Sequence, residues 1–200
     1  VTPLNFLVDE RAVMFPFHFD LSERVEMIPY QMPCYPSDSA MVREWVGQFW
    51  RPGQLIETYA LLDTMSRAIA AGFVYGQREE PGVQRPAETL QRRGGSCRDF
   101  ATLFIESCRF LGLAARFVSG YLHSPATVQG EGSTHAWAEV YLPGAGWKGF
   151  DTTSGTMTGA DHIAVAVTRH PADAPPIEGS FVGPPGCKST MRVKVDVREA

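Results

Sequence analysis

Two kinds of hydrophobic periodicity occupy separate parts of this chain, and their order limits the folds that it can adopt. Between residues 56 and 73, apolar side chains recur every three or four positions, which indicates an amphipathic helix. From residue 115 onward, apolar positions alternate or form short runs, as is typical of strands. Helices followed by strands favour an α+β fold with an antiparallel sheet.

The remaining elements follow from local signals. Ser96 is a good helix N-cap, Asp99 stands three residues later as in a capping box, and Gly112 is a natural helix stop. Residues 124–133 and 171–189 are expected to be long loops. We expect further helices at 37–47, 87–92 and 96–111, and strands at 115–123, 135–142, 147–151, 163–168 and 191–197.

The N-terminal part has a different pattern. Phe15, Phe17 and Phe19 alternate with other residues, which predicts a strand over 13–21, and Pro16 within it indicates an edge strand. Residues 29–38 are rich in proline and polar groups, as linkers are. We therefore predict two units: residues 1–30 as the remnant of an N-terminal β module, and residues 31–200 as the main domain.

Charge and cysteine content narrow the functional classes. The net charge is -4 and no block of Lys and Arg occurs, which argues against nucleic-acid binding. The sequence contains no run of 18 or more apolar residues, so it predicts no membrane span. The four cysteines form no CxxC pair, so we expect free thiols in a reducing compartment, with a cytoplasmic location as the default.

Cys97 has the sequence surroundings that a nucleophilic thiol needs. It is expected at the first position of helix 96–111, where backbone N–H groups and the helix dipole favour the reactive thiolate. Gly94 and Gly95 let the backbone approach the site closely, and this position makes burial of Cys97 less expected. Its backbone N–H is a candidate oxyanion-hole donor. The other cysteines, Cys34, Cys108 and Cys187, fit the role of small buried hydrophobic residues.

His135 and Asp151 are the candidate base and orienting group. Alternation along strand 135–142 places His135 and Trp137 on one face and Ala136 on the other. A turn at 144–146 leads into strand 147–151, so an antiparallel hairpin brings Asp151 beside His135. A carboxylate there can hold the imidazole in one tautomer. The other histidines are interpreted as surface or local hydrogen-bonding residues: His18, His123, His162 and His170.

Three segments, in order, resemble the bacterial transglutaminase-like superfamily. They are residues 93–104 with 111–121, residues 134–154, and the tail at 161–167 and 175–179. The resemblance covers about residues 37–198. It implies a papain-like α+β fold, in which the cysteine-bearing helix packs on an antiparallel sheet that carries His and Asp. It also implies that Cys97 is the nucleophile, His135 the general acid/base and Asp151 the orienting group.

The same resemblance carries two further expectations. Members of this group often have an extra N-terminal β domain, so residues 1–30 would be its last strands, with most of that domain missing. Eukaryotic transglutaminases use an upstream Trp to hold the oxyanion. In this chain Trp45 and Trp50 have no matching local motif and Tyr75 is another candidate, so the second oxyanion donor stays open. No acidic cluster resembles a calcium site, and neither a metal nor another cofactor is expected.

The sequence thus predicts a bacterial cysteine peptidase or amidase that acts through a thioester on a peptide or protein amide. Hydrolysis is favoured because nothing obviously excludes water or binds a lysine donor. The alternatives are protein-glutamine transamidation, a non-catalytic binding module, and a metal-dependent hydrolase that uses the same Cys, His and Asp as ligands. The natural substrate and the oligomeric state stay open. Trp137, Tyr121 and Tyr75 are expected to line the cleft or to pack in the core.

Overall fold

The computed structural model describes residues 7–78, 80, 82–123, 133–176, 179–180, 182–184, 186–188 and 190 of the 200-residue chain. The expected strand at 191–197 and nearly all of the expected loop at 124–133 lie outside these residues. The expected loop at 171–189 is described in part, and it begins with the 3-10 turn η3, Pro171–Asp173.

A five-stranded antiparallel sheet forms one side of the molecule, with strand order β8-β7-β6-β5-β9. Four of these strands confirm the predicted ones, and β8 is an added edge strand. The hairpin between β6 and β7 turns at Gly144 and Gly146, whose φ angles of 80° and 73° suit glycine. The strands are β5 Ala115–Leu122, β6 Ser133–Leu142, β7 Gly146–Asp151, β8 Thr156–Met157 and β9 His162–Thr168.

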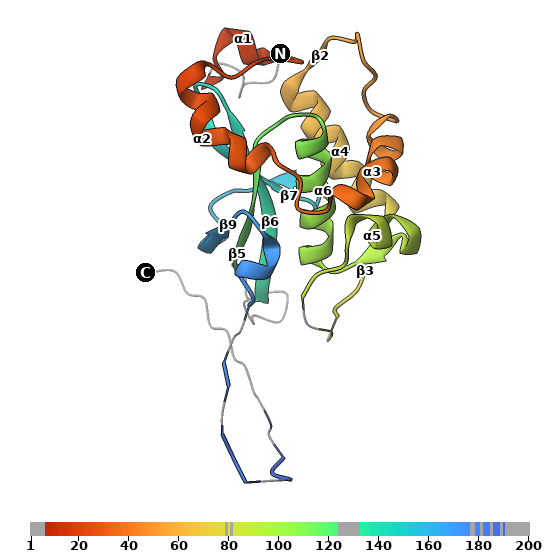
Figure 1. The fold of residues 1–200 in the computed structure, drawn as a ribbon, viewed down its shortest axis with the longest axis vertical. Helices are drawn as coiled ribbons and strands as arrows, with labels where there is room; N and C mark the ends of the chain where they lie inside the picture. The colour runs from red at the N-terminus through yellow and green to blue at the C-terminus, as the bar shows by residue number, and fades with distance from the viewer. Residues whose placement is uncertain are drawn as a thin grey trace.

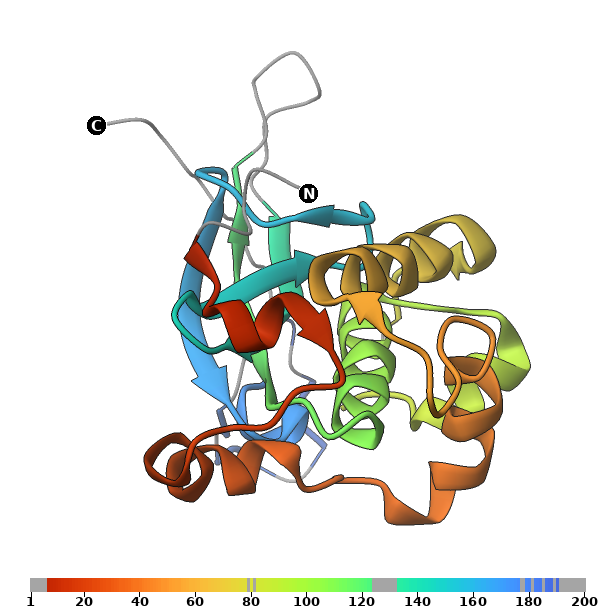
Figure 2. The ribbon, with the colours of Figure 1, turned by 90° about the horizontal axis from the view of Figure 1, so that it is seen from above.

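The helices also confirm the predicted pattern. They are α3 Ser39–Val46, preceded by the 3-10 turn η2 Pro36–Asp38, then α4 Thr58–Gly72, α5 Pro86–Arg92 and α6 Cys97–Phe110. Figures 1 and 2 show α6 standing between the sheet and the three other helices, so it is covered on both sides. In the described part of the chain, no helix has both the length and the apolar character needed to cross a bilayer.

The core lies where α6 meets the sheet. The even-numbered residues of β6 from position 136 onward are buried there, as the alternation along this strand predicts: Ala136, Ala138, Val140 and Leu142. Phe104 of α6 packs on Phe150 of β7 with ring centroids 5.5 Å apart. Because α6 is held by this apolar contact along its length, the position of its first residue is fixed relative to the sheet.

The N-terminal part differs from the expected strand. Within 13–21 only β1, Met14–Phe15, is a strand, and it pairs with β2, Ile56–Glu57, in a separate two-stranded sheet. A short helix, α1 Glu10–Val13, precedes it. A longer helix, α2 Leu21–Gln31, occupies residues expected to be strand and linker, with Asp20 and Glu23 forming its capping box.

Side chains connect this N-terminal part to the rest of the chain. The Thr58 hydroxyl donates to the carbonyl of Ala12 at 2.7 Å, and the Tyr141 hydroxyl donates to Glu23 at 3.3 Å. The division of the chain near residue 30 stays a prediction, and the structure shows contacts across it.

A buried ion pair on α6 anchors two segments that are distant in the sequence. The Glu106 and Arg109 side chains are 2.8 Å apart and almost fully buried. The Glu106 carboxylate also accepts the backbone N–H groups of Cys34 and Tyr35, at 3.0 to 3.1 Å. Arg109 donates to the carbonyl of Arg169 just after β9. One charged pair therefore joins α6 to two distant segments.

We expect Glu106→Gln to lower the free energy of unfolding by about 3 kcal/mol, because it leaves Arg109 buried without its counter-charge. The matched control is Glu88→Gln, which removes an exposed pair with Arg92 and should cost about 0.5 kcal/mol or less. Urea denaturation followed by circular dichroism measures both. Equal losses for the two variants would contradict the anchoring role.

Candidate active site

The N-terminus of α6 is fixed by one buried carboxylate. Asp99 accepts the backbone N–H and the hydroxyl of Ser96 at 2.8 and 2.9 Å, which confirms the capping box expected from the sequence. Its other oxygen accepts the N–H of Gln84 at 2.6 Å, and the Arg78 guanidinium lies 3.2 Å away. The first turn of the helix is thereby tied to the loop before α5.

The two glycines before this helix are needed by the chain itself. Strand β4, Gly94–Gly95, pairs in parallel with β3, Val74–Tyr75. A Cβ at Gly94 would lie 2.9 Å from the Val74 carbonyl oxygen, and one at Gly95 would lie 2.8 Å from the Asp99 Cβ. The two glycines therefore let β4 approach β3 closely, and this approach places Cys97 near Tyr75.

Cys97 is the first residue of α6 and is 9% exposed. The position of Cys97 at the helix start predicts that it is less buried than an ordinary helix cysteine. This prediction is wrong, because the thiol borders the hydrophobic core. Arg98 follows it, donates to the carbonyls of Pro171 and Ala174, and stacks over Phe117. Although burial lowers the pKa of Arg98, the guanidinium still places positive charge next to the thiol.

His135 and Asp151 form a buried ion pair, as the hairpin argument predicts. The His135 Nε2 and Asp151 Oδ2 atoms are 3.0 Å apart, and the two side chains are 7% and 2% exposed. Ala138 on β6 pairs with Phe150 on β7. Asp151 lies one position beyond Phe150, so His135 on β6 is the diagonal neighbour of Asp151. The ring N–H is not aligned for a regular hydrogen bond, so we describe the contact as an ion pair.

The pKa values of this pair move in opposite directions. Burial alone would lower the pKa of His135, but contacts with the Asp151 carboxylate and the Cys97 thiol outweigh it and raise the pKa to about 9. Burial alone would raise the pKa of Asp151, but His135 and the N–H of Thr153 hold it well below its usual range. The Asp151 carboxylate and the Cys97 thiol thus act on the pKa of the same imidazole.

This shift links protonation to stability. The folded-state pKa of His135 lies above the value of ~6.5 for a free histidine. The protonated ring therefore stabilises the fold fully below pH ~6.5, and that contribution is lost as the pH rises through about 9.

His162 is a member of this group that the sequence interpretation missed. Its Nε2 lies 3.3 Å from Asp151 Oδ2, and its side chain is 10% exposed. His162 makes the expected kind of local hydrogen bond, with Gly159, but its interpretation as a surface residue is wrong because it also contacts the buried Asp151. Only the fold brings these two residues together, because His162 lies 11 positions after Asp151 in the sequence and the edge strand β8 stands between them.

The residues proposed to contact substrate lie at different depths. Tyr75 is half-exposed, and burial together with the nearby Cys97 and Asp151 charges raises its pKa. Tyr121 is half-buried on β5 and pairs with Thr134, next to the Gly120–His135 pair. Trp137 is fully buried beside the rings of His135 and His162, which supports packing rather than contact with substrate.

The two upstream tryptophans have other contacts. Trp45 is buried and packs against Phe49 with ring centroids 4.8 Å apart. The Trp50 indole N–H donates to the Gln54 carbonyl at 2.9 Å. Of the three candidates for the second oxyanion donor, Tyr75 is the one with an interaction with Cys97 in the described structure.

His135, Asp151 and His162 also offer ligand atoms that lie within 4.8 Å of one another, the arrangement of a possible metal site. The Gly159 N–H donates to His162 Nδ1 at 3.3 Å. A neutral His162 then carries its proton on Nε2, the atom a metal would need. The geometry therefore suits hydrogen bonds to Asp151 better than metal coordination.

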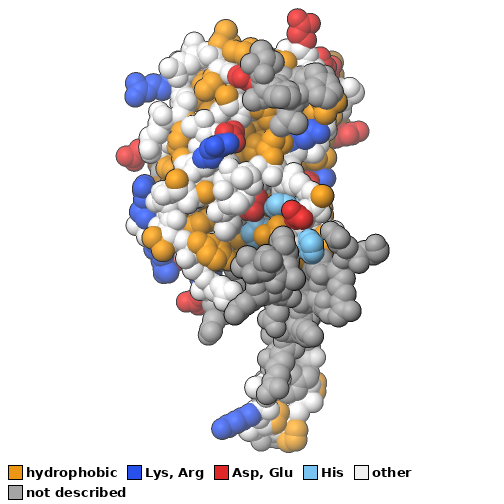
Figure 3. Space-filling view, turned by 180° about the vertical axis from the view of Figure 1, so that it is seen from behind, with side chains coloured by type: hydrophobic (Ala, Val, Ile, Leu, Met, Phe, Trp, Pro, Cys, Tyr) orange, Lys and Arg blue, Asp and Glu red, His pale blue; other side chains and the backbone are white. Residues whose placement is uncertain are grey.

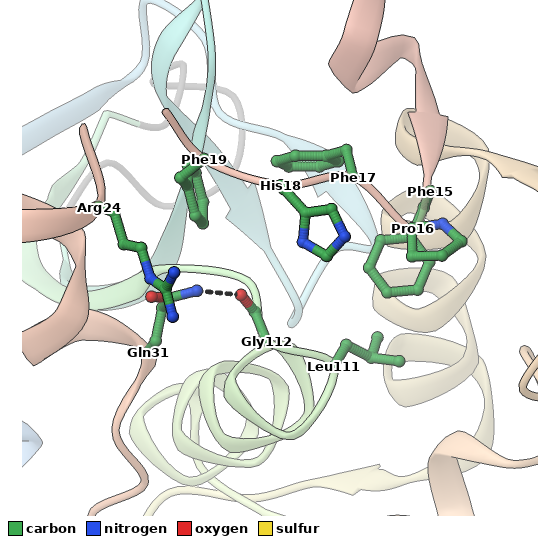
Figure 4. Close-up of a pocket in the computed structure, with 9 residues that line it drawn as sticks. All are labelled: Phe15, Pro16, Phe17, His18, Phe19, Arg24, Gln31, Leu111 and Gly112. Atoms are coloured by element: carbon green, nitrogen blue, oxygen red, sulfur yellow. Dashed lines mark hydrogen bonds between the residues drawn. The ribbon is translucent and has the colours of Figure 1, made fainter. Parts of the chain in front are cut away.

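A separate cavity of about 440 Å³ lies at the opposite end of α6, beside Leu111 and Gly112. Three phenylalanine rings and the side chains of His18, Arg24 and Gln31 surround it (Figure 4). None of the predicted site residues lines it. On the face turned away in Figure 1, histidine and acidic side chains gather at one place among hydrophobic ones (Figure 3).

A family model and several curated relatives are similar to this chain. Residues 56–152 match the model of the transglutaminase-like superfamily. An uncharacterised Mycobacterium tuberculosis protein is 34% identical over 172 residues, which are 81% of this chain and 54% of that protein. A Mycobacterium leprae protein is 35% identical over 100 residues, 48% of this chain and 35% of its own length. The chain thus spans about half or less of the curated relatives it matches.

A solved structure is also similar. A candidate cysteine protease from Cytophaga hutchinsonii superposes with a TM-score of 0.62 and 26% identity. The match covers 74% of this chain and 49% of that one. It confirms the predicted α+β fold, in which a helix packs on an antiparallel sheet.

We expect the His135 imidazole to titrate near pH 9 in an NMR titration of ¹⁵N-histidine-labelled protein. Asp151→Asn should lower that pKa, because it removes the charge that favours the imidazolium. The control is Asp161→Asn, which removes the exposed carboxylate 3.5 Å from the half-buried ring of His123. A His135 ring that titrates near 6.5 in the wild-type protein would contradict the coupled pair.

Proposed function

We propose that this chain, which belongs to the transglutaminase-like superfamily through residues 56–152, is a thiol-dependent hydrolase of peptide or protein amides. The observation that carries the proposal is the buried pair of His135 and Asp151, together with the effect of Cys97 on the pKa of His135. The thiol at the start of a helix affects the pKa of a buried imidazole, and that imidazole is paired with a carboxylate. In this proposal they are nucleophile, general acid/base and orienting group.

The thiol is activated by proton transfer to His135. The unpaired N–H groups at the start of α6 and the neighbouring Arg98 favour a thiolate, and Asp151 favours the imidazolium. The thiolate electron pair then forms a bond to the amide carbonyl carbon, and the carbonyl electrons move onto oxygen. The Cys97 backbone N–H is the proposed first donor to that oxyanion, and the Tyr75 hydroxyl the proposed second.

Collapse of this intermediate breaks the bond to nitrogen. His135 gives its proton to the departing amine, and a thioester on Cys97 is left. The neutral imidazole then takes a proton from the incoming water, whose oxygen forms the new carbonyl bond while the thiolate leaves. The products are a carboxylic acid and an amine, and the site returns to its starting state.

An amine in place of water would give transamidation by the same steps. We favour water as the acyl acceptor, because hydrolysis of the thioester needs no second binding site, whereas transfer to a lysine donor would need one. A non-catalytic module and a metal-dependent hydrolase stay as alternatives. The hydrogen bond from Gly159 to His162 Nδ1 disfavours only a metal site that includes His162.

A cytoplasmic location is part of the proposal. The four cysteines are all free thiols, as suits a reducing compartment. The matched residues make up 54% of the Mycobacterium tuberculosis relative, so the proposal concerns the transglutaminase-like region and not the whole of such a longer protein.

Site-resolved alkylation by iodoacetamide tests the activated thiol. At pH 6.5 we expect Cys97 to react at least tenfold faster than the exposed Cys187, because an ordinary thiol of pKa ~8.5 is only about 1% ionised there. Mass spectrometry of timed digests gives both rates in one sample. Cys108 is the buried reference, since burial strongly raises its pKa.

His135→Ala should bring the rate at Cys97 down to that of Cys187. If Cys97 in the wild-type protein reacts no faster than Cys187, the thiolate–imidazolium pair is absent and the proposed function is wrong. Equal rates in wild type and His135→Ala would lead to the same conclusion.

A product assay separates the two acyl acceptors. A glutamine-containing peptide library is incubated with a dansylated primary amine, and products are identified by mass spectrometry. We expect hydrolysed amides, abolished by Cys97→Ala and retained in Cys108→Ala. Dominance of dansylated peptide would overturn hydrolysis in favour of transamidation.

The same assay has an expected pH dependence. The hydrolysis rate should fall above about pH 9, because deprotonated His135 has no proton for the leaving amine. A rate that keeps rising through pH 10 would contradict this role of His135.

A further inference from the structure

We infer that His162 is a positioning residue of this site, a second imidazole that donates a hydrogen bond to Asp151 and fixes the carboxylate for His135. The inference rests on the proposed function, and it assigns a role to a residue outside the expected triad. It is carried by the contacts of Asp151, by the tautomer of His162 and by the path of the chain between β8 and β9.

Asp151 is held through both of its oxygens. Oδ1 accepts the backbone N–H of Thr153 at 2.9 Å, with the N–H of Ser154 at 3.5 Å. Oδ2 faces two imidazoles, His135 at 3.0 Å and His162 at 3.3 Å. Thr153 and Ser154 therefore fix one oxygen, and His162 is the group that restrains the oxygen used by His135.

The tautomer of His162 follows from its other nitrogen. Nδ1 accepts the backbone N–H of Gly159 at 3.3 Å, so in the neutral ring Nδ1 has no proton and Nε2 carries it. Nε2–H then donates to Asp151 Oδ2. A backbone group thus selects the tautomer that acts as donor, as a carboxylate does for the imidazole of a triad.

The chain delivers His162 by crossing from one side of the sheet to the other. β8 pairs at one edge with β7, and β9 pairs at the other edge with β5, where His162 lies opposite Leu122. On the way, Thr158 donates its backbone N–H to the Gly149 carbonyl at 3.0 Å. Its side chain occupies the space that a Cβ at Gly149 would need.

Packing restricts the ring once it is there. Trp137 meets the His162 ring edge to face with centroids 5.2 Å apart, and the His135 ring lies 6.0 Å away. Gly120 makes room for this arrangement, because a Cβ there would lie 2.9 Å from the Trp137 ring. Among the described residues, His135 and Asp151 are the ionisable groups with contacts to the His162 ring. Asp161, the preceding residue, is paired with the half-buried His123.

Three variants separate positioning from packing. His162→Leu removes the donor, and His162→Gln keeps an N–H donor at a similar reach. His123→Leu is the matched control, since it removes an imidazole–carboxylate contact at the same end of the sheet without touching Asp151. The readout is the pH profile of Cys97 alkylation by iodoacetamide from pH 5 to 10, with Cys187 as the internal reference and thermal unfolding as the check of folding.

We expect His162→Leu to lower the rate at Cys97 near pH 6.5 by about tenfold or more, the effect of losing one hydrogen bond to a charged group. His162→Gln should stay within about threefold of wild type, and His123→Leu should be unchanged. A His162→Leu profile that matches wild type overturns the inference while leaving the proposed function intact. If Cys97 is not activated in the wild-type protein, the proposed function itself has failed.

A second measurement on the wild-type protein covers the case in which His162→Leu does not fold. Long-range ¹H–¹⁵N spectra at pH 7.5 report which ring nitrogen carries the proton. We expect His162 as the Nε2–H tautomer, with that proton protected from exchange. A proton on Nδ1 alone would overturn the inference, because His162 could not then donate to Asp151.

Discussion

A single buried carboxylate, that of Asp99, determines where α6 begins, and the position of Cys97 depends on it. Asp99 caps the helix through Ser96 and at the same time holds Gln84 and Arg78. A nucleophile at the first helical position needs such a fixed start, because helix ends otherwise fray by a turn. The glycines before it serve the same purpose: they let β3 and Asp99 come close enough for the first turn to be held from both sides.

Positive charge surrounds the thiol. The helix N-terminus, the Arg98 guanidinium and the imidazolium of the His135–Asp151 pair all favour the thiolate. A buried carboxylate is costly unless it is hydrogen-bonded. Asp151 meets that requirement with two backbone N–H groups and the His162 imidazole, and His135 provides the opposite charge. The low pKa of Asp151 and the raised pKa of His135 are two results of this one arrangement.

Local signals are sufficient to predict the helix that carries Cys97 and the hairpin that carries His135 and Asp151. Both depend on turn glycines, caps and alternation, which are readable within 20 residues. The expected strand at 13–21 fails because alternation records only which side chains share a face. Phe15, Phe17 and Phe19 do pack edge to face, but within this described segment only Met14 and Phe15 have a partner strand. His162 is missed for a related reason: its contact with Asp151 depends on a crossover over the sheet, which no local pattern encodes.

The depth of the site affects the charges that it holds. Cys97 is 9% exposed and the His135–Asp151 pair is deeper, while Tyr75 is half-exposed. Burial limits the contact of the charged pair with water, which strengthens the attraction between its two charges. The depth of the pair therefore contributes to the raised pKa of His135 only because the Asp151 carboxylate lies within contact distance, since burial without that partner would lower it.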